Sequence, residues 1–163
     1  MSPETKEWLS ARVPTFTNLD TDEQNSIYDF TLLWSMFEGE KLSGYCNMRK
    51  IREYADELTE ANQLSNCGLD EYLPYLIDRY YVEGSLNDKF QKLHIGRSGN
   101  PPEITESLCS DTLSEKTKLI GCLGIVFRLR NNLFHGEKWQ YELANQKSNF
   151  DNASKFLMRL MSL

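Results

Sequence analysis

Apolar residues recur along this chain with the spacing of helices rather than of strands. Apolar side chains return at every third or fourth position with polar ones between them, and β-branched runs are few. The pattern covers residues 21–37, 47–64, 69–81, 113–135 and 150–161. We therefore predict an all-α protein. A chain of 163 residues suits one domain, which we expect to span residues 1–163.

Local signals predict where several of these helices begin and end. A capping-box pattern over residues 21–24 starts the first helix. The helix that begins near Leu69 contains Pro74, and we expect this proline in the first turn, where its missing N–H has no intrahelical acceptor. Residues 96–102 are rich in Gly, Pro, Ser and Asn and predict a loop. Gly136 ends the longest predicted helix.

The composition is that of an ordinary globular protein, with 40% hydrophobic and 26% charged residues. No segment has the roughly 20 consecutive apolar residues of a membrane span, and the polar start lacks the apolar core of a signal peptide. The four cysteines show no Cys-x-x-Cys or Cys/His spacing. We therefore expect reduced thiols, no metal, no cofactor, no membrane contact and a cytoplasmic location.

Charge is unevenly distributed along the chain, whose formal net charge is −6. Residues 1–115 carry 10 Lys and Arg against 21 Asp and Glu, whereas residues 116–163 carry 8 against 3. The net charges of the two parts are therefore −11 and +5. This distribution favours an anion site in the last third of the chain, in spite of the acidic total.

The basic third contains the most informative segment, Arg130-Asn131-Asn132-Leu133-Phe134-His135-Gly136. Arginine is a permanent cation and histidine titrates near neutral pH, so the two together suit phosphodiester chemistry without a metal. The same residues also suit an ordinary helix end, because cations favour the negative end of the helix dipole and glycine favours the left-handed cap. The segment by itself leaves both interpretations open.

Helix geometry constrains how the segment could act. Asn131 and His135 are four residues apart and share one face of a continuous helix. Arg130 and His135 are five apart, which separates their directions by roughly 140° at 3.6 residues per turn. Either the last turn is distorted, or a two-fold interface places His135 of one chain near Arg130 of another.

This segment closely resembles the signature of HEPN domains, in which an arginine, a following polar residue and a histidine five positions after the arginine recur at a helix end. Residues 28–38 and 123–129 also resemble the first and the last long core helix of that family, so the resemblance covers most of the chain. It implies an up-and-down bundle of four to five core helices and a homodimer that brings two motifs together. It also implies metal-independent endoribonuclease activity of the kind found in toxin–antitoxin, abortive-infection and other antiphage systems.

The resemblance assigns a role to each motif residue. His135 would be the general acid and base, Arg130 would bind the scissile phosphate, and Asn131 would orient one of these groups or the phosphate. Arg128, Lys138 and Asn132 are candidates for contact with the RNA backbone. Some family members carry a tyrosine that an antitoxin modifies two residues after the histidine, whereas this chain has Glu137 there.

Two other functions compete with a ribonuclease. One is a HEPN-fold module without catalysis that binds RNA, a nucleotide or a partner protein. The other is an unrelated helical interaction domain in which Arg130 and His135 only finish a helix. The partners expected of the ribonuclease are RNA, a second copy of the chain and an antitoxin or another defence-system protein.

Overall fold

The computed structural model describes residues 2–110, 112–134 and 145–163, and His135 and Lys138 lie outside them. Helices make up 76% of the structure, so the predicted all-α class is confirmed. The α-helices are α1 (Pro3–Arg12), α2 (Thr21–Lys41), α3 (Met48–Glu60), α4 (Leu69–Tyr80), α5 (Asp88–Gln91), α6 (Pro102–Cys109), α7 (Glu115–Phe134) and α9 (Lys147–Met161). The 3-10 helices are η1 (Pro14–Asn18), η2 (Leu64–Asn66) and η3 (Ile95–Ser98).

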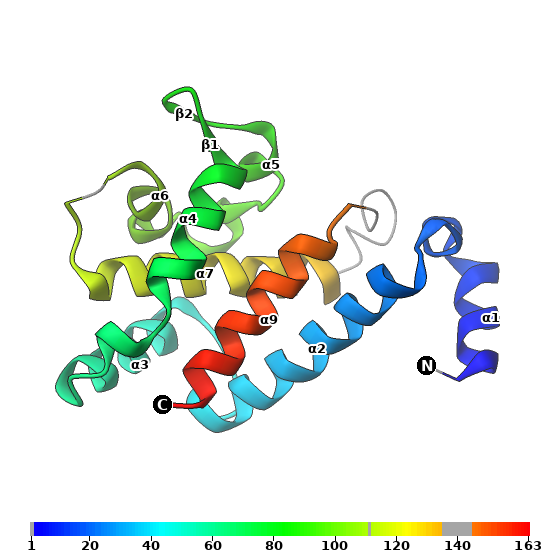
Figure 1. Ribbon diagram of the computed structural model, residues 1–163, viewed down its shortest axis with the longest axis horizontal. Helices are drawn as coiled ribbons and strands as arrows, with labels where there is room; N and C mark the ends of the chain where they lie inside the picture. Colours follow the sequence, from blue (N-terminus) through cyan, green and yellow to red (C-terminus); the bar gives the residue numbers. More distant parts are fainter. Residues whose placement is uncertain (1, 111, 135–144) are drawn as a thin grey trace.

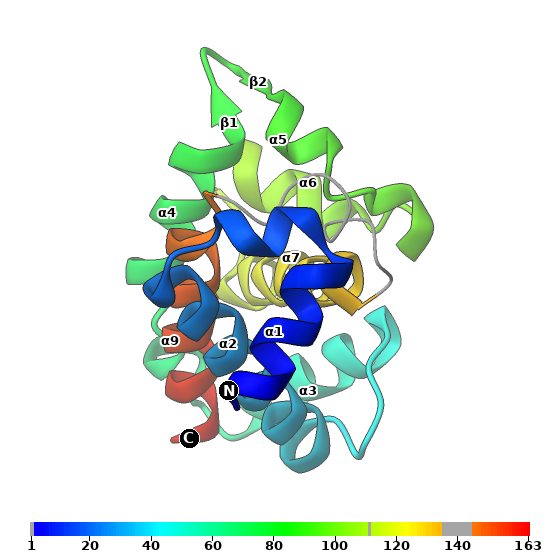
Figure 2. The ribbon, with the colours of Figure 1, turned by 90° about the vertical axis from the view of Figure 1, so that its right-hand side faces the viewer.

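Helix α7 forms the centre of the molecule. Figure 2 looks nearly along its axis and shows α2, α3, α4, α6 and α9 arranged around it. Its residues from Leu119 to Val126 are all buried, in keeping with a helix that is apolar on nearly every side. Because α7 contacts helices from both halves of the sequence, its position determines where Arg130 lies.

Helices α2 and α9 lie side by side and run in the same direction across one side of α7 (Figure 1). Phe30 of α2 packs on Phe150 of α9 with ring centroids 5.1 Å apart. Trp34 of α2 stacks on Phe127 of α7 at 6.1 Å. These aromatic contacts fix the angular position of α2, and with it the side chains that α2 presents to the end of α7.

The start of α2 confirms a capping box, but one residue earlier than predicted. Asp20 is the N-cap: its Oδ1 accepts from the Glu23 backbone N–H at 2.8 Å, and Glu23 Oε2 accepts from the Asp20 N–H at 3.2 Å. The sequence pattern predicts the cap at Thr21 instead. Aspartate in extended backbone geometry (φ −70°, ψ 173°) is at least as good an N-cap as threonine, which explains the shift.

Pro74 lies in the second turn of α4, so the expectation of a first-turn proline is wrong. The carbonyl that would have accepted a bond from residue 74 belongs to Asp70, and both residues are exposed. Water can therefore satisfy this carbonyl. Helix α4 then leads into a hairpin of two short strands, β1 (Tyr81–Val82) and β2 (Ser85–Leu86), which the hydrophobic pattern does not predict.

The hydrophobic pattern does not predict helices α1 and α6 either. Helix α1 has no buried residue, contacts η1 and stands away from the other α-helices (Figure 1). Helix α6 packs closely on α7, where the missing side chains of Gly121 and Gly124 leave room for Ser107 and Ile104. None of the described helices is long and apolar enough to cross a membrane.

Candidate functional site at the end of α7

Helix α7 reaches the surface along one narrow stripe near its C-terminal end. Between Leu119 and Phe134, the side chains that are not buried are Phe127, Arg130 and Phe134. They are spaced three and four residues apart and therefore share one face of the helix. Arg130 is the charged member of this stripe, so it determines what the end of α7 can offer a ligand.

The guanidinium of Arg130 is held by three groups. Its Nη1 donates to Asn131 Oδ1 at 3.0 Å, and its Nη2 lies 3.8 Å from Glu38 Oε2 on α2. Its Cζ lies 4.8 Å from the centre of the Phe134 ring. Arg130 Nε is buried and has no hydrogen-bond partner among the described residues. These contacts fix the position of the guanidinium but leave its Nε–H donor without an acceptor among the described residues.

These contacts bear on the helix-end interpretation of Arg130. An arginine that caps a helix donates to the free carbonyls of the last turn. Within the described residues, Arg130 donates to the side chain of Asn131 and pairs across to α2 instead. Helix capping therefore does not account for the position of this guanidinium.

Cys46 lies in the loop between α2 and α3, near the same cluster. Burial raises the pKa of its thiol, the Glu38 carboxylate raises it further, and the Arg130 cation opposes the rise. The thiol is therefore protonated at neutral pH and is a poor nucleophile. We assign Cys46 to the packing of this loop against the core and not to the chemistry.

The two motif neighbours Arg128 and Asn132 are turned to the inside. They are 4% and 3% exposed. Arg128 Nε donates to the Leu93 carbonyl at 2.9 Å, and its Nη2 donates to Asn132 Oδ1 at 3.1 Å. Asn132 Nδ2 donates to the Lys92 carbonyl at 3.0 Å. Both residues hold the chain before η3 against α7, and this burial does not suit contact with RNA.

Replacing Arg128 by methionine is expected to lower the free energy of unfolding by about 2 kcal/mol. The change keeps much of the apolar stem but leaves buried oxygen acceptors without their donor. Urea denaturation measures the effect. Arg49→Met, at an arginine whose side chain is 70% exposed, is the matched control and should change stability by less than about 0.5 kcal/mol. Equal effects of the two substitutions would contradict this role of Arg128.

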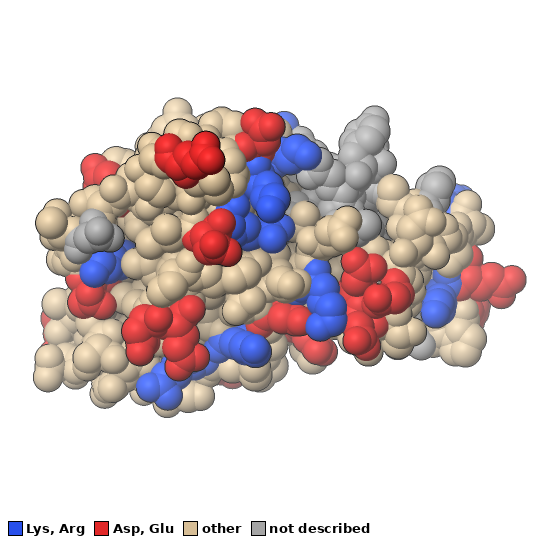
Figure 3. All heavy atoms as spheres, turned by 45° about the horizontal axis from the view of Figure 1, so that its top comes forward, with Lys and Arg blue, Asp and Glu red and all other residues tan. Residues whose placement is uncertain are grey.

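The basic residues that the structure describes between positions 116 and 163 do not form one cationic surface. Lys116 pairs with Asp56, Lys118 with Glu115 and Lys147 with Asp151. Arg128 is buried. Figure 3 shows acidic and basic side chains interspersed over the face it presents. The uneven charge along the sequence is therefore largely neutralised in space, and it adds little support for an anion site.

The remaining metal-ligating side chains that the structure describes add no metal site to the Arg130 cluster. Among the described residues, no group of three or more His, Cys, Asp and Glu side chains could hold a metal ion. His94, the histidine outside the motif, is exposed at the start of η3, where it has left-handed backbone geometry with φ 53°. Glu38 was not among the predicted site residues, since its contact with Arg130 joins distant parts of the chain.

Compared with known proteins, the chain matches no family model, no curated protein and no solved structure.

Proposed function

We propose that this protein is a metal-independent endoribonuclease of the HEPN type, which acts as a homodimer in antiphage defence or as a toxin. The observation that supports this most is the position of Arg130. It is the charged side chain on the one stripe where the buried end of α7 meets the surface, five residues before His135. The resemblance of the segment to the HEPN signature supplies the reaction.

In the proposed reaction, the 2′-hydroxyl of the RNA attacks the adjacent phosphorus, and the bond from phosphorus to the 5′-oxygen breaks. His135 takes the proton of the attacking hydroxyl or gives a proton to the departing 5′-oxygen. Arg130 stabilises the charge that develops on the phosphoryl oxygens. The products are a 2′,3′-cyclic phosphate and a 5′-hydroxyl, and DNA is resistant because it lacks the nucleophile.

The contacts of Arg130 suit this role. Asn131 holds one guanidinium nitrogen, which is an orienting function. The 3.8 Å separation from Glu38 is longer than a charge-assisted hydrogen bond, so a phosphate can replace this partner with two direct bonds. Because Arg130 and His135 diverge on a straight helix, we propose that the working site combines Arg130 of one chain with His135 of another.

The contact with Glu38 favours a second candidate function, a HEPN-fold module that binds RNA, a nucleotide or a partner protein without catalysis. In one chain, the carboxylate already neutralises part of the Arg130 charge. Such a module would retain ligand binding but would not cleave RNA. A cleavage assay therefore separates the two functions.

The test incubates a structured RNA with the wild-type protein in EDTA, beside a His135→Ala variant. We expect the wild-type protein to cleave, the products to carry cyclic phosphate ends, and the variant to lose at least about a hundredfold in rate. A His94→Ala variant, at an exposed histidine outside the motif, is the matched control and should cleave normally. Cleavage that EDTA abolishes, or that survives His135→Ala, would refute the proposed mechanism.

A further inference from the structure

An exposed aromatic ring with two cations beside it lies in the loop between α2 and α3. The Tyr45 ring is 49% exposed. Arg49 Nη2 donates to the Tyr45 hydroxyl at 3.2 Å, and Lys50 Nζ lies 5.5 Å from the ring centre. Both cations also pair with Glu53, at 3.6 and 3.1 Å, although the Arg49 side chain remains 70% exposed. The ring and the Arg49 guanidinium are thus both accessible from solvent.

The surrounding segment is basic within an acidic part of the chain. Residues 41–52 contain four cations, Lys41, Arg49, Lys50 and Arg52, and no acidic residue. Arg52 is committed to Glu103, with N–O distances of 2.7 and 3.0 Å. Arg49 and Lys50 share the single carboxylate of Glu53, so the charge beside Tyr45 stays positive. A polyanion therefore finds local positive charge here, although the whole protein is negative.

This loop adjoins the Arg130 cluster. It begins one turn after Glu38, the carboxylate that pairs with Arg130. It ends at Met48, whose side chain packs against α7 at Gly124. Gly124 lies six residues before Arg130, or about 9 Å along the helix. Tyr45 lies between Glu38 and Met48 in the sequence, so both flanks of its loop contact α7, one at Arg130 itself and one less than two turns before it.

Arg130 forms a second pair of a cation and an exposed aromatic ring, because its guanidinium lies over the ring of Phe134, which is 51% exposed. Exposed aromatic rings beside cations are the features by which proteins bind single-stranded nucleic acid, with bases stacked on the rings and phosphates on the cations. A duplex keeps its bases stacked on each other and offers no free base face to such rings.

We propose that Tyr45, Arg49 and Lys50 form a docking surface for single-stranded RNA that leads to Arg130. A base stacks on the Tyr45 ring, and the adjacent phosphates contact Arg49 and Lys50. This proposal rests on the proposed function, for which it names the substrate as an unpaired RNA segment. Tyr45, Arg49 and Lys50 thereby replace Arg128 and Asn132, which are buried, as the residues expected to contact RNA.

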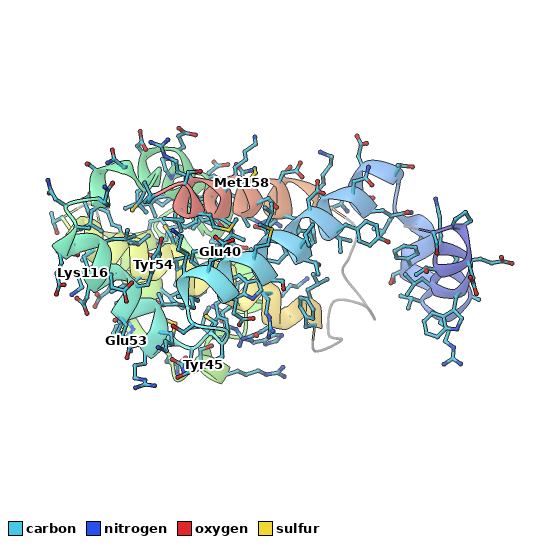
Figure 4. The ribbon with its side chains drawn as sticks, turned by 90° about the horizontal axis from the view of Figure 1, so that it is seen from below. Glu40, Tyr45, Glu53, Tyr54, Lys116 and Met158 are labelled. Atoms are coloured by element: carbon cyan, nitrogen blue, oxygen red, sulfur yellow. The ribbon has the colours of Figure 1, made fainter. Side chains whose placement is uncertain are left out.

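The chain offers a matched control far from this surface. Trp8 on α1 is 57% exposed, and the Arg12 guanidinium lies 5.1 Å from the centre of its ring. This pair also combines an exposed ring with an arginine, but Figure 4 shows Tyr45 near Glu53, on the side of the molecule away from α1. Non-specific attraction of RNA to any exposed ring and cation would affect both sites equally.

The experiment measures binding of a fluorescent 2′-O-methyl RNA of about ten nucleotides, which lacks the reactive hydroxyl, by fluorescence anisotropy. Tyr45→Ala and Arg49→Glu should each weaken binding roughly tenfold. Tyr45→Phe keeps the ring and should bind within about twofold of wild type. Trp8→Ala and Arg12→Glu should also bind within about twofold, and unchanged melting temperatures confirm that all variants are folded.

Several results would overturn the docking surface: equal weakening by the Tyr45 and Trp8 variants, unchanged binding in Tyr45→Ala, or a duplex that competes as well as the single strand. Absence of wild-type binding at about 100 μM, the weak end of non-specific binding, would also overturn it. Cleavage is scored separately on unmodified RNA. Specific binding without cleavage refutes the proposed ribonuclease activity and supports the docking surface. Cleavage that depends on His135 but is unchanged by Tyr45→Ala refutes only the docking surface.

Discussion

Replacing Arg130 by alanine is expected to lower the rate of RNA cleavage by two to three orders of magnitude, roughly the effect of removing one group that stabilises developing oxyanion charge. The loss should fall on kcat and on kcat/KM alike, because the interaction strengthens in the transition state. Single-turnover measurements over a range of protein concentrations, from far below saturation to saturation, give both values. The folded state should lose less than about 1 kcal/mol, since the contact with Glu38 is long and partly exposed.

Two variants separate the charge of Arg130 from its contacts. Glu38→Gln removes the same ion pair but leaves the arginine, and it should cleave within about threefold of wild type. Arg130→Lys keeps the charge but loses the planar pair of donors, so we expect a smaller loss of about tenfold. If Glu38→Gln is as inactive as Arg130→Ala, the arginine acts by holding α2 and not on the phosphate.

Replacing Gly121 by alanine is expected to lower the free energy of unfolding by about 3 kcal/mol, near the upper end for overpacking a core. A Cβ at this position would meet the Glu103 carbonyl oxygen at 2.5 Å and the Ser107 Cβ at 2.6 Å. Because backbone stands in the way, α6 has to move as a whole. Urea denaturation measures the loss, and the melting temperature should fall by about 10 °C.

Gly39→Ala is the control for this substitution. Gly39 lies in α2 with ordinary backbone geometry, and a Cβ added there would meet no atom within 4 Å. Alanine there should stabilise the protein by about 0.5 to 1 kcal/mol, because glycine is a poor helix former. Similar effects at both positions would show that helix propensity, and not the approach of α6 to α7, determines the result.

The sequence was sufficient for the helices whose apolar stripe is long and regular. Helix α7 is apolar on nearly every side, and α2 and α9 have regular apolar spacing, so their existence did not depend on knowing their neighbours. Helix α6 differs, because Ile104 and Leu108 are its only large aliphatic residues and two prolines, Pro101 and Pro102, stand at its start. Its helix depends on the space left by Gly121 and Gly124 of α7, which no local pattern reports.

The candidate site, too, could be predicted only in part from the sequence. The spacing of Arg130 and His135 identified the segment, but it could not show that Arg128 is buried and unsuited to contact with RNA. The two arginines are two positions apart, so they point in directions about 200° apart around the helix. Packing then turns Arg128 inward to Leu93 and Arg130 outward to Glu38. Both partners come from other helices or loops, and only the folded chain reveals them.

The narrow stripe of Phe127, Arg130 and Phe134 also limits how this end of the molecule can diverge during evolution. At the neighbouring positions of α7, a new side chain would have to fit an existing interior, so selection for folding would remove most substitutions there. At Phe134, which is 51% exposed, a substitution changes what the surface beside Arg130 offers a ligand and little of the interior. Related chains with different specificities should therefore differ first at Phe134, while Arg130, which the proposed reaction needs, and Phe127, which packs on Trp34, are retained.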